Sequence, residues 1–191
     1  SFGIFMNNAN QYGVMNMAGG SFVNPTRTVV FGNNGSGATN NVGFLNFAGG
    51  TFSTGVNVTN NVGTSTGNQV FLNFAGGTFK ATSALTAALP VTVTGQTVLA
   101  TVFGAIDNSA VATGTNWTGG ANFDTNGNIV YLATGLTGAS GTGVTQANLS
   151  VVGGSGYLGA PLVQFSTAGL VANGTPAAGY AVMDGDKLKG I

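Results

Sequence analysis

The side chains that could carry catalytic chemistry are four aspartates, because the sequence contains no His, no Cys and no Glu. Without His and Cys, neither a Ser-His-Asp triad nor a Cys-His pair can form. A glycosidase would need two carboxylates held close together. The only carboxylate side chains are Asp107, Asp124, Asp184 and Asp186. We interpret all four as solvated turn residues, and we therefore expect no catalytic residue and no enzyme activity.

One aspartate begins a segment that resembles the start of a calcium loop. Asp124, Asn126 and Asn128 place oxygen ligands at alternate positions, as an EF-hand loop does. Ile129 stands where that loop has its glycine, and no Glu follows. We interpret the segment as a turn and keep calcium as the weaker alternative; no other metal or cofactor is expected.

Charge is scarce, which excludes several ligand classes. Charged residues make up 4% of the chain, with four basic and four acidic side chains, against roughly 25% in ordinary soluble domains. Nucleic-acid binding needs clustered Lys and Arg, so we exclude it. A polysaccharide lyase would need a basic residue beside acidic calcium ligands. Arg27 and Lys80 both lie far along the sequence from Asp124, so a lyase is only a distant alternative.

The sequence also bears on cellular location. The absence of cysteine excludes disulfides without fixing the compartment. No apolar run approaches the roughly 20 residues of a membrane-spanning helix. The chain begins at Ser1 without an initiator Met, which we interpret as a fragment processed from a longer precursor.

The elements that must position these side chains are organised by one short sequence motif, here called the phrase, which occurs three times. The copies are Met15–Phe22, Leu45–Phe52 and Leu72–Phe79, and they start about 30 and then about 27 residues apart. Such a period is typical of repeat architectures. Large apolar residues alternate with small or polar ones up to a Gly-Gly pair, as in a half-buried strand that reaches a bend. We predict strand, glycine corner, strand, with these rings in register on a buried face: Phe47, Phe52, Phe74 and Phe79.

The predicted fold class is all-β, with a β-solenoid or stacked β-sheet repeats that continue into a less regular Gly/Thr-rich β-region. We place the repeat stack at residues 1–94 and the second region at residues 95–191. Lys80–Leu89, before Pro90, is either a short helix or a loop that crosses the stack. An Asp-Gly pair predicts a β-hairpin within residues 183–191.

Two segments resemble the autotransporter-associated β-strand repeats of very large bacterial surface proteins. Leu72–Ala81 matches their Asn-Phe-x-Gly-Gly-Thr-Leu-like strand, and Gly119–Asn128 contains their Asp-Thr-Asn-Gly-like turn. Phe52 and Phe79 stand where that family usually has Leu. The resemblance covers about half of the chain and brings no catalytic residues. It implies a β-solenoid passenger segment that is exported and displayed outside the cell.

The N-terminal segment has two interpretations. Ser1–Asn10 is either the first strand of the stack or a terminal strand that pairs with a neighbouring molecule. No charged residue precedes Arg27, and so little charge leaves almost no repulsion between copies. We therefore expect a homopolymer that forms through β-edges. The candidate self-association residues are Phe2, Ile4, Phe5 and Met6.

These observations predict a secreted structural protein that builds an extracellular fibre, sheath or surface layer. The alternative is an adhesin stalk or passenger segment whose tip binds glycans or surfaces. Trp117 and the four tyrosines could stack on sugars, although we interpret them as core or interface residues. We expect the protein outside the cell or at its surface, without a membrane-spanning segment.

Overall fold

Strands in this protein pair with the strand that lies one repeat further along the chain. The computed structural model describes residues 2–3, 9–24, 26–31, 39–60, 66–92, 95–104, 118–139, 154–158, 161, 163 and 181–190. The strands are β1 (Phe2–Gly3), β2 (Tyr12–Asn24), β3 (Val29–Phe31), β4 (Val42–Thr54), β5 (Val58–Asn60), β6 (Gln69–Phe74), β7 (Thr78–Ala81), β8 (Thr97–Val102), β9 (Asn122–Asp124), β10 (Leu136–Gly138), β11 (Val182–Asp184) and β12 (Lys187–Gly190).

The chain divides into two compact units. The first comprises Ser1–Asp107 and Asn116–Ala139, and the second comprises Asn108–Thr115 and Ser140–Ile191. The described residues form strands, turns and bends but no helix, which confirms the predicted all-β class. None of these residues belongs to a helix with the length and hydrophobicity that a membrane crossing requires.

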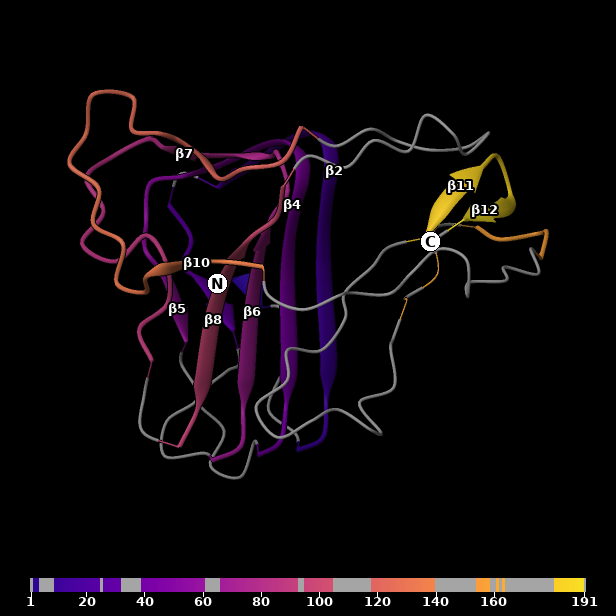
Figure 1. The fold of residues 1–191 in the computed structure, drawn as a ribbon, viewed down its shortest axis with the longest axis horizontal. Coiled ribbons are helices and arrows are strands. Elements are labelled where there is room, and N and C mark those ends of the chain that lie inside the picture. The colour runs from indigo at the N-terminus through magenta and orange to yellow at the C-terminus, as the bar shows by residue number, and fades with distance from the viewer. Residues whose placement is uncertain are drawn as a thin grey trace. The chain divides into compact units, whose positions relative to one another are not determined.

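Two parallel sheets make up the regular structure of the first unit. The large sheet has the order β10-β8-β6-β4-β7-β9, with β2 also paired to β4, and the small sheet has the order β1-β3-β5. Figure 1 shows β2, β4, β6 and β8 running side by side. Equivalent residues of successive copies are direct partners, as in Met15–Leu45 and Leu45–Leu72. Each repeat therefore adds one strand to the same ladder.

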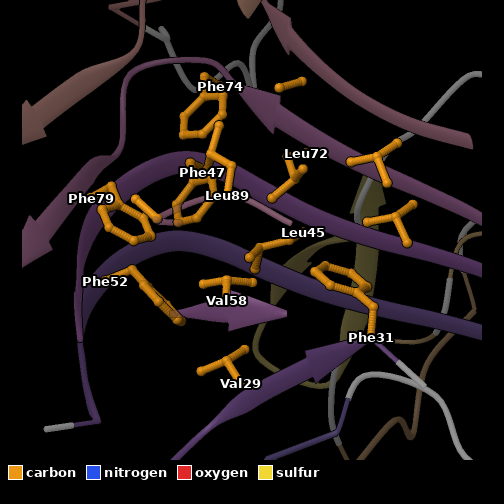
Figure 2. Close-up of a cluster of buried hydrophobic side chains, with 14 of the residues drawn as sticks. Val29, Phe31, Leu45, Phe47, Phe52, Val58, Leu72, Phe74, Phe79 and Leu89 are labelled. Carbon is orange, nitrogen blue, oxygen red and sulfur yellow. The ribbon is translucent and has the colours of Figure 1, made fainter. Parts of the chain in front are cut away.

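A hydrophobic core lies between the two sheets (Figure 2). The Phe47 and Phe74 rings stack with centroids 4.8 Å apart and planes 6° apart. The Phe52 and Phe79 rings are 5.6 Å apart, and all four side chains are at most 1% exposed. Val58 of the small sheet belongs to the same cluster. The predicted register of the phenylalanines on a buried face is thus confirmed.

The other face of the large sheet is also buried at the centre of β4 and β6, although the alternating pattern predicts half-buried strands. Phe44 and Phe71 alternate with the core-facing residues of β4 and β6, yet they are only 1% and 2% exposed. Their rings stack 4.9 Å apart, and Tyr12 packs against Phe44 at 5.4 Å. Burial raises the pKa of the Tyr12 phenol. Cover on both faces is typical of parallel sheets.

A fourth copy of the repeat follows the three that the phrase reveals. Val98, Ala100 and Val102 of β8 stand beside Val70, Leu72 and Phe74. Beyond it, Phe123 of β9 pairs with Phe79. Because β8 pairs with β6, the expected boundary after residue 94 lies within the first unit.

The segment for which we considered a helix begins within β7 and continues from Thr82 as a loop along the stack. Thr82 donates its backbone N–H to the Thr54 carbonyl, and Leu85 donates to Ile129. These donors therefore bond to neighbouring repeats rather than to carbonyls four residues back, as a helix requires. Leu85 and Leu89 are 1% and 0% exposed, so the apolar residues that suggested a helix serve the core.

The Gly-Gly pairs form the corners of the large sheet, as predicted. Gly50 has a φ of 71°, which disfavours L-residues with a side chain. A Cβ atom on Gly50 would lie 2.5 Å from the Gly20 carbonyl oxygen. Gly20 itself has a φ of 68°, but a Cβ there would meet nothing within 4 Å. Close packing of two backbones therefore restricts Gly50 but not Gly20.

The second unit contributes the predicted C-terminal hairpin. β11 and β12 pair in antiparallel fashion, with Gly185 and Asp186 between them. The hairpin is extended by Gly154–Leu158, since Tyr157 N–H donates to the Asp186 carbonyl at 3.0 Å. The predicted hairpin is thus confirmed, but its turn is formed by Gly185 and Asp186, because Asp184 still belongs to β11.

The two glycines provide a matched test of the corner. Gly20→Ala should cost about 1–2 kcal/mol of unfolding free energy, because both variants adopt an unfavourable positive φ. Gly50→Ala should cost a further 1–3 kcal/mol or so, because its methyl group also pushes two backbones apart. Urea unfolding of dilute protein measures both values. Equal losses for the two variants would contradict the close approach.

The phenylalanine stack provides a second test. Phe47→Ala should lower the free energy of unfolding by about 3–5 kcal/mol, because it leaves a cavity between the sheets. Tyr131→Ala is the aromatic control: Tyr131 is 61% exposed, and we expect a loss of about 0.5 kcal/mol or less. A Phe47→Ala protein as stable as the control would show that this ring is not part of the core.

Candidate functional site

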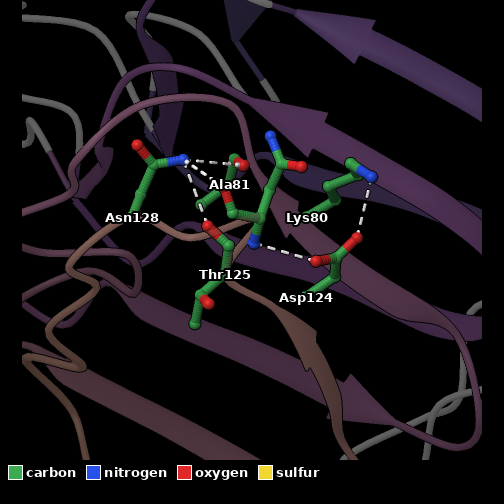
Figure 3. Close-up of polar contacts among 6 residues, drawn as sticks. Lys80, Ala81, Asp124, Thr125 and Asn128 are labelled. Carbon is green, nitrogen blue, oxygen red and sulfur yellow. Dashed lines mark hydrogen bonds and ion pairs between the residues drawn. The ribbon is translucent and has the colours of Figure 1, made fainter.

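The three calcium candidates lie in a turn whose polar atoms are bonded to one another (Figure 3). Asp124 Oδ1 accepts a hydrogen bond from the backbone N–H of Asn126 at 2.8 Å. Asp124 Oδ2 is 2.8 Å from the ammonium nitrogen of Lys80. Asn128 donates through Nδ2 to the Thr125 carbonyl at 3.1 Å. Both carboxylate oxygens are therefore engaged by protein donors, and Asn128 directs its amino group at the turn.

The backbone explains why this segment has its composition. Asn126 and Gly127 have φ values of 48° and 77°, and Asn and Gly are the residues that best tolerate this conformation. The side chain of Asp124 closes the turn two residues on, as Asx turns do. The residues that resemble a calcium loop are thus also those that a tight turn requires.

An ion pair joins the third and fourth copies at this turn. Lys80 lies on β7 and Asp124 on β9, and their side chains are 36% and 42% exposed. The hydrogen bond from Lys80, followed by the one from the backbone of Asn126, lowers the pKa of Asp124 below its ordinary value of 3.8. Exposed pairs contribute little to stability because water screens them.

The pKa of Asp124 can be tested by carboxyl NMR titration. Its midpoint should lie below 3.8, and Lys80→Met should raise it by removing the larger cause. Because the folded pKa is lowered, the stabilising effect of the pair is present above the unfolded pKa and is lost as pH falls through the folded one. An unchanged midpoint in Lys80→Met would contradict the ion pair.

The other described aspartates, Asp184 and Asp186, belong to the second unit, whereas Asp124 belongs to the first. Asp186 belongs to the C-terminal hairpin, where its Oδ2 accepts a hydrogen bond from Gly156 N–H at 2.9 Å. Asp184 ends β11, and Asp107 lies outside the described residues. In the part of the chain that the structure describes, no three acidic, His or Cys side chains cluster as metal ligands.

The N-terminal self-association candidates can be placed only in part. Phe2 lies on β1, whose backbone pairs in parallel with β3 of the same chain through Phe2–Val29. This pairing agrees with the interpretation of Ser1–Asn10 as the first strand of the stack. Ile4, Phe5 and Met6 lie outside the described residues, as does Trp117.

A ladder of asparagine side chains runs along the large sheet. Asn73 Nδ2 donates to Asn46 Oδ1 at 2.8 Å, and Asn46 Nδ2 donates to Asn16 Oδ1 at 2.7 Å. Thr101 occupies the next position of this row. The signal was present in the sequence, because Asn is the second residue of every copy of the phrase.

A second amide ladder lines the corner that precedes the large sheet. The backbone N–H of Gln11 donates to Asn41 Oδ1 at 2.6 Å, and that of Asn41 donates to Asn68 Oδ1 at 2.8 Å. Asn41 and Asn68 are both 0% exposed. The preceding residues, Asn40 and Gly67, have positive φ values. This row of buried amides was not predicted from the sequence.

The outermost strands at the two ends of the stack, β2 and β10, both carry exposed residues. Asn16 is exposed on β2, whereas its partner Asn46 on β4 is 7% exposed; Val23 is 65% exposed, whereas its partner Ser53 is 8% exposed. At the other end, all three residues of β10 are exposed. Within the described residues, β2 pairs only with β4, and β10 only with β8.

A shallow, open depression lies beside the small sheet. It has a volume of about 380 Å³, and the residues that line it offer hydroxyl and amide groups but no charge. They are Thr28, Gly55, Val56, Asn57, Thr59, Ala84 and Thr86. The Asn57 amide is already engaged, since its Nδ2 donates to Thr86 Oγ1 at 2.9 Å.

Comparisons with known proteins found no match. No family model matches the chain, and no curated protein or solved structure matches it. The ladders and the exposed ends of the stack are therefore the observations from which a function must be argued.

Proposed function

We propose that this chain is a β-solenoid structural protein that self-associates into an extracellular fibre, sheath or surface layer. The observation that carries this proposal is the parallel ladder, which passes in register from copy to copy and reaches an exposed edge strand at both ends. A ladder that adds one strand per repeat can add a strand from another molecule by the same hydrogen bonds.

The alternation of the chain between its two sheets supports the solenoid. β1, β3 and β5 belong to the small sheet, while β2, β4 and β6 belong to the large one. Each return to a sheet places the new strand beside the strand of the preceding repeat, in parallel. A chain that winds in this way forms coils, and each coil contacts chiefly its neighbours.

Composition supports self-association. The net charge is zero and only 4% of residues are charged, so little electrostatic repulsion separates two copies. β2 contains no charged residue across its 13 positions, although Lys on an edge strand is a common protection against pairing. Rows of Asn and Phe are the side-chain ladders that stabilise stacked, in-register strands.

We place the protein outside the cell or at its surface. This part of the proposal rests on the resemblance of Leu72–Ala81 and Gly119–Asn128 to the repeats of exported bacterial passenger segments. An adhesin segment that binds glycans is the second candidate. The hydroxyl-lined depression around Thr28, Thr59 and Thr86 is the observation that favours it.

Assembly can be tested by sedimentation and negative-stain electron microscopy over a range of concentrations. We expect filaments or sheets from the unchanged protein. Ala18→Lys adds a charge to exposed β2 and should reduce assembly at least about tenfold, since edge charges oppose strand addition. Thr82→Lys adds the same charge at an exposed bend away from both edges and should leave assembly unchanged.

Two outcomes would count against this function. A protein that stays monomeric at high concentration would remove self-association and leave the adhesin candidate, for which a glycan array is the direct test. Equal assembly by both lysine variants would show that contacts form elsewhere than at β2.

A further inference from the structure

We propose that copies of this chain join head to tail, with the first half of β2 in one copy paired in parallel to β10 of the next. This inference rests on the proposed self-association and specifies its geometry. The paired segments are Tyr12–Ala18 at one end of the stack and Leu136–Gly138 at the other.

The internal register determines which residues would meet. Asn16, Asn46, Asn73 and Thr101 are successive members of one row on the large sheet, and Thr137 of β10 is the next. A second copy that places its Asn16 beside Thr137 continues this row without a change of register. The same step brings Met15 beside Leu136 and Met17 beside Gly138.

The contact is confined to half of β2 because, at the far end of the stack, one half of the large sheet has one strand more than the other half. β10 pairs with β8 and extends the half of the sheet that begins with Tyr12. In the other half β9 is the outermost described strand, one repeat behind β10. Ser21–Asn24 of an added copy would therefore not reach β9 directly.

Exposed apolar side chains mark the end that would receive β2. Ile129, Tyr131 and Leu132 follow β9 and Leu136 lies on β10, and they are 66%, 61%, 40% and 38% exposed. Val130, between two of them, packs against the core, so this segment already follows the inward and outward alternation of a repeat. An added copy would extend the core over this end and remove apolar surface from water.

Electrostatics does not oppose this contact. β2 and β10 contain no charged residue. The nearest charges on the large sheet, Lys80 and Asp124, neutralise each other at 2.8 Å. Neither edge therefore carries a charge that would have to be buried without a partner.

A symmetric dimer is the competing arrangement. Two β2 strands related by a two-fold axis would run antiparallel, whereas every strand pair in the first unit is parallel among the described residues. The asparagine row would then end at the contact instead of continuing. A two-fold contact also closes after two copies, while a head-to-tail contact leaves a new edge for the next copy.

Single cysteines can distinguish these arrangements, because the chain has none of its own. Asn16 and Thr137 are both exposed. Neighbouring strands lie about 4.8 Å apart, within the Cα separation of about 4.4–6.8 Å that a disulfide spans. The experiment oxidises Asn16→Cys alone, Thr137→Cys alone and an equal mixture of the two under assembly conditions. Circular dichroism before oxidation verifies that each variant retains its β-structure.

We expect a covalent dimer when the mixture is oxidised and no covalent dimer when either variant is oxidised alone. A chain that carries both cysteines should give a series of covalent oligomers, and Thr82→Cys mixed with Thr137→Cys should give none. Dimers from Asn16→Cys alone would establish the two-fold contact and overturn this inference. Filaments without the mixed disulfide would overturn it while leaving the proposed function intact, whereas monomers throughout would overturn both.

Discussion

Parallel pairing in register is the constraint on which the rest of the first unit depends. A strand that bonds to the strand one repeat later must meet it at equivalent residues, since a slip of one residue would turn every core side chain outward. Like residues therefore lie beside like residues: Asn46 beside Asn73, Phe47 beside Phe74. Repeats of unequal length remain compatible because their differences fall in the connections. Val42 pairs with a residue 27 positions later, whereas Val29 pairs with one 29 positions later.

The same constraint explains how polar groups can lie so deep in this protein. A buried amide is costly unless it is hydrogen-bonded. In this stack the side-chain oxygen of one repeat accepts from the backbone of the preceding repeat, although Asn41 Nδ2 has no partner among the described residues. Asn41 and Asn68 are both fully buried, and the backbone N–H of Asn41 donates to the side chain of Asn68. Backbones can also approach closely at a corner where one residue has no Cβ atom, as Gly50 does beside the Gly20 carbonyl. The same turn, the same hydrogen-bonded row and the same glycine corner therefore recur at equivalent positions of successive repeats.

Much of this architecture could be predicted from the sequence, because three copies preserve both their large residues and their glycines. The fourth was missed because β8 replaces the aromatic residues by smaller ones, such as Val102 where the third copy has Phe74. Local pattern could not decide between helix and loop before Pro90, since the bonds that settle it come from residues more than 20 positions away. The turn at Asp124 shows the same limit for the site, because a tight turn and a calcium loop favour the same residue types.

The fourth repeat also shows how this architecture can acquire new parts during evolution. Val102 and Asn122 are 20 residues apart, whereas their partners Phe74 and Thr78 are four apart, so sixteen additional residues enter at this corner. The ladder nevertheless resumes in register, and Gly120 N–H bonds to the Phe103 carbonyl across the junction. Lengthening a loop costs little, about 0.6 kcal/mol for each doubling. Duplication of a repeat can therefore lengthen the stack, while its corners accept inserted segments on which selection can act separately.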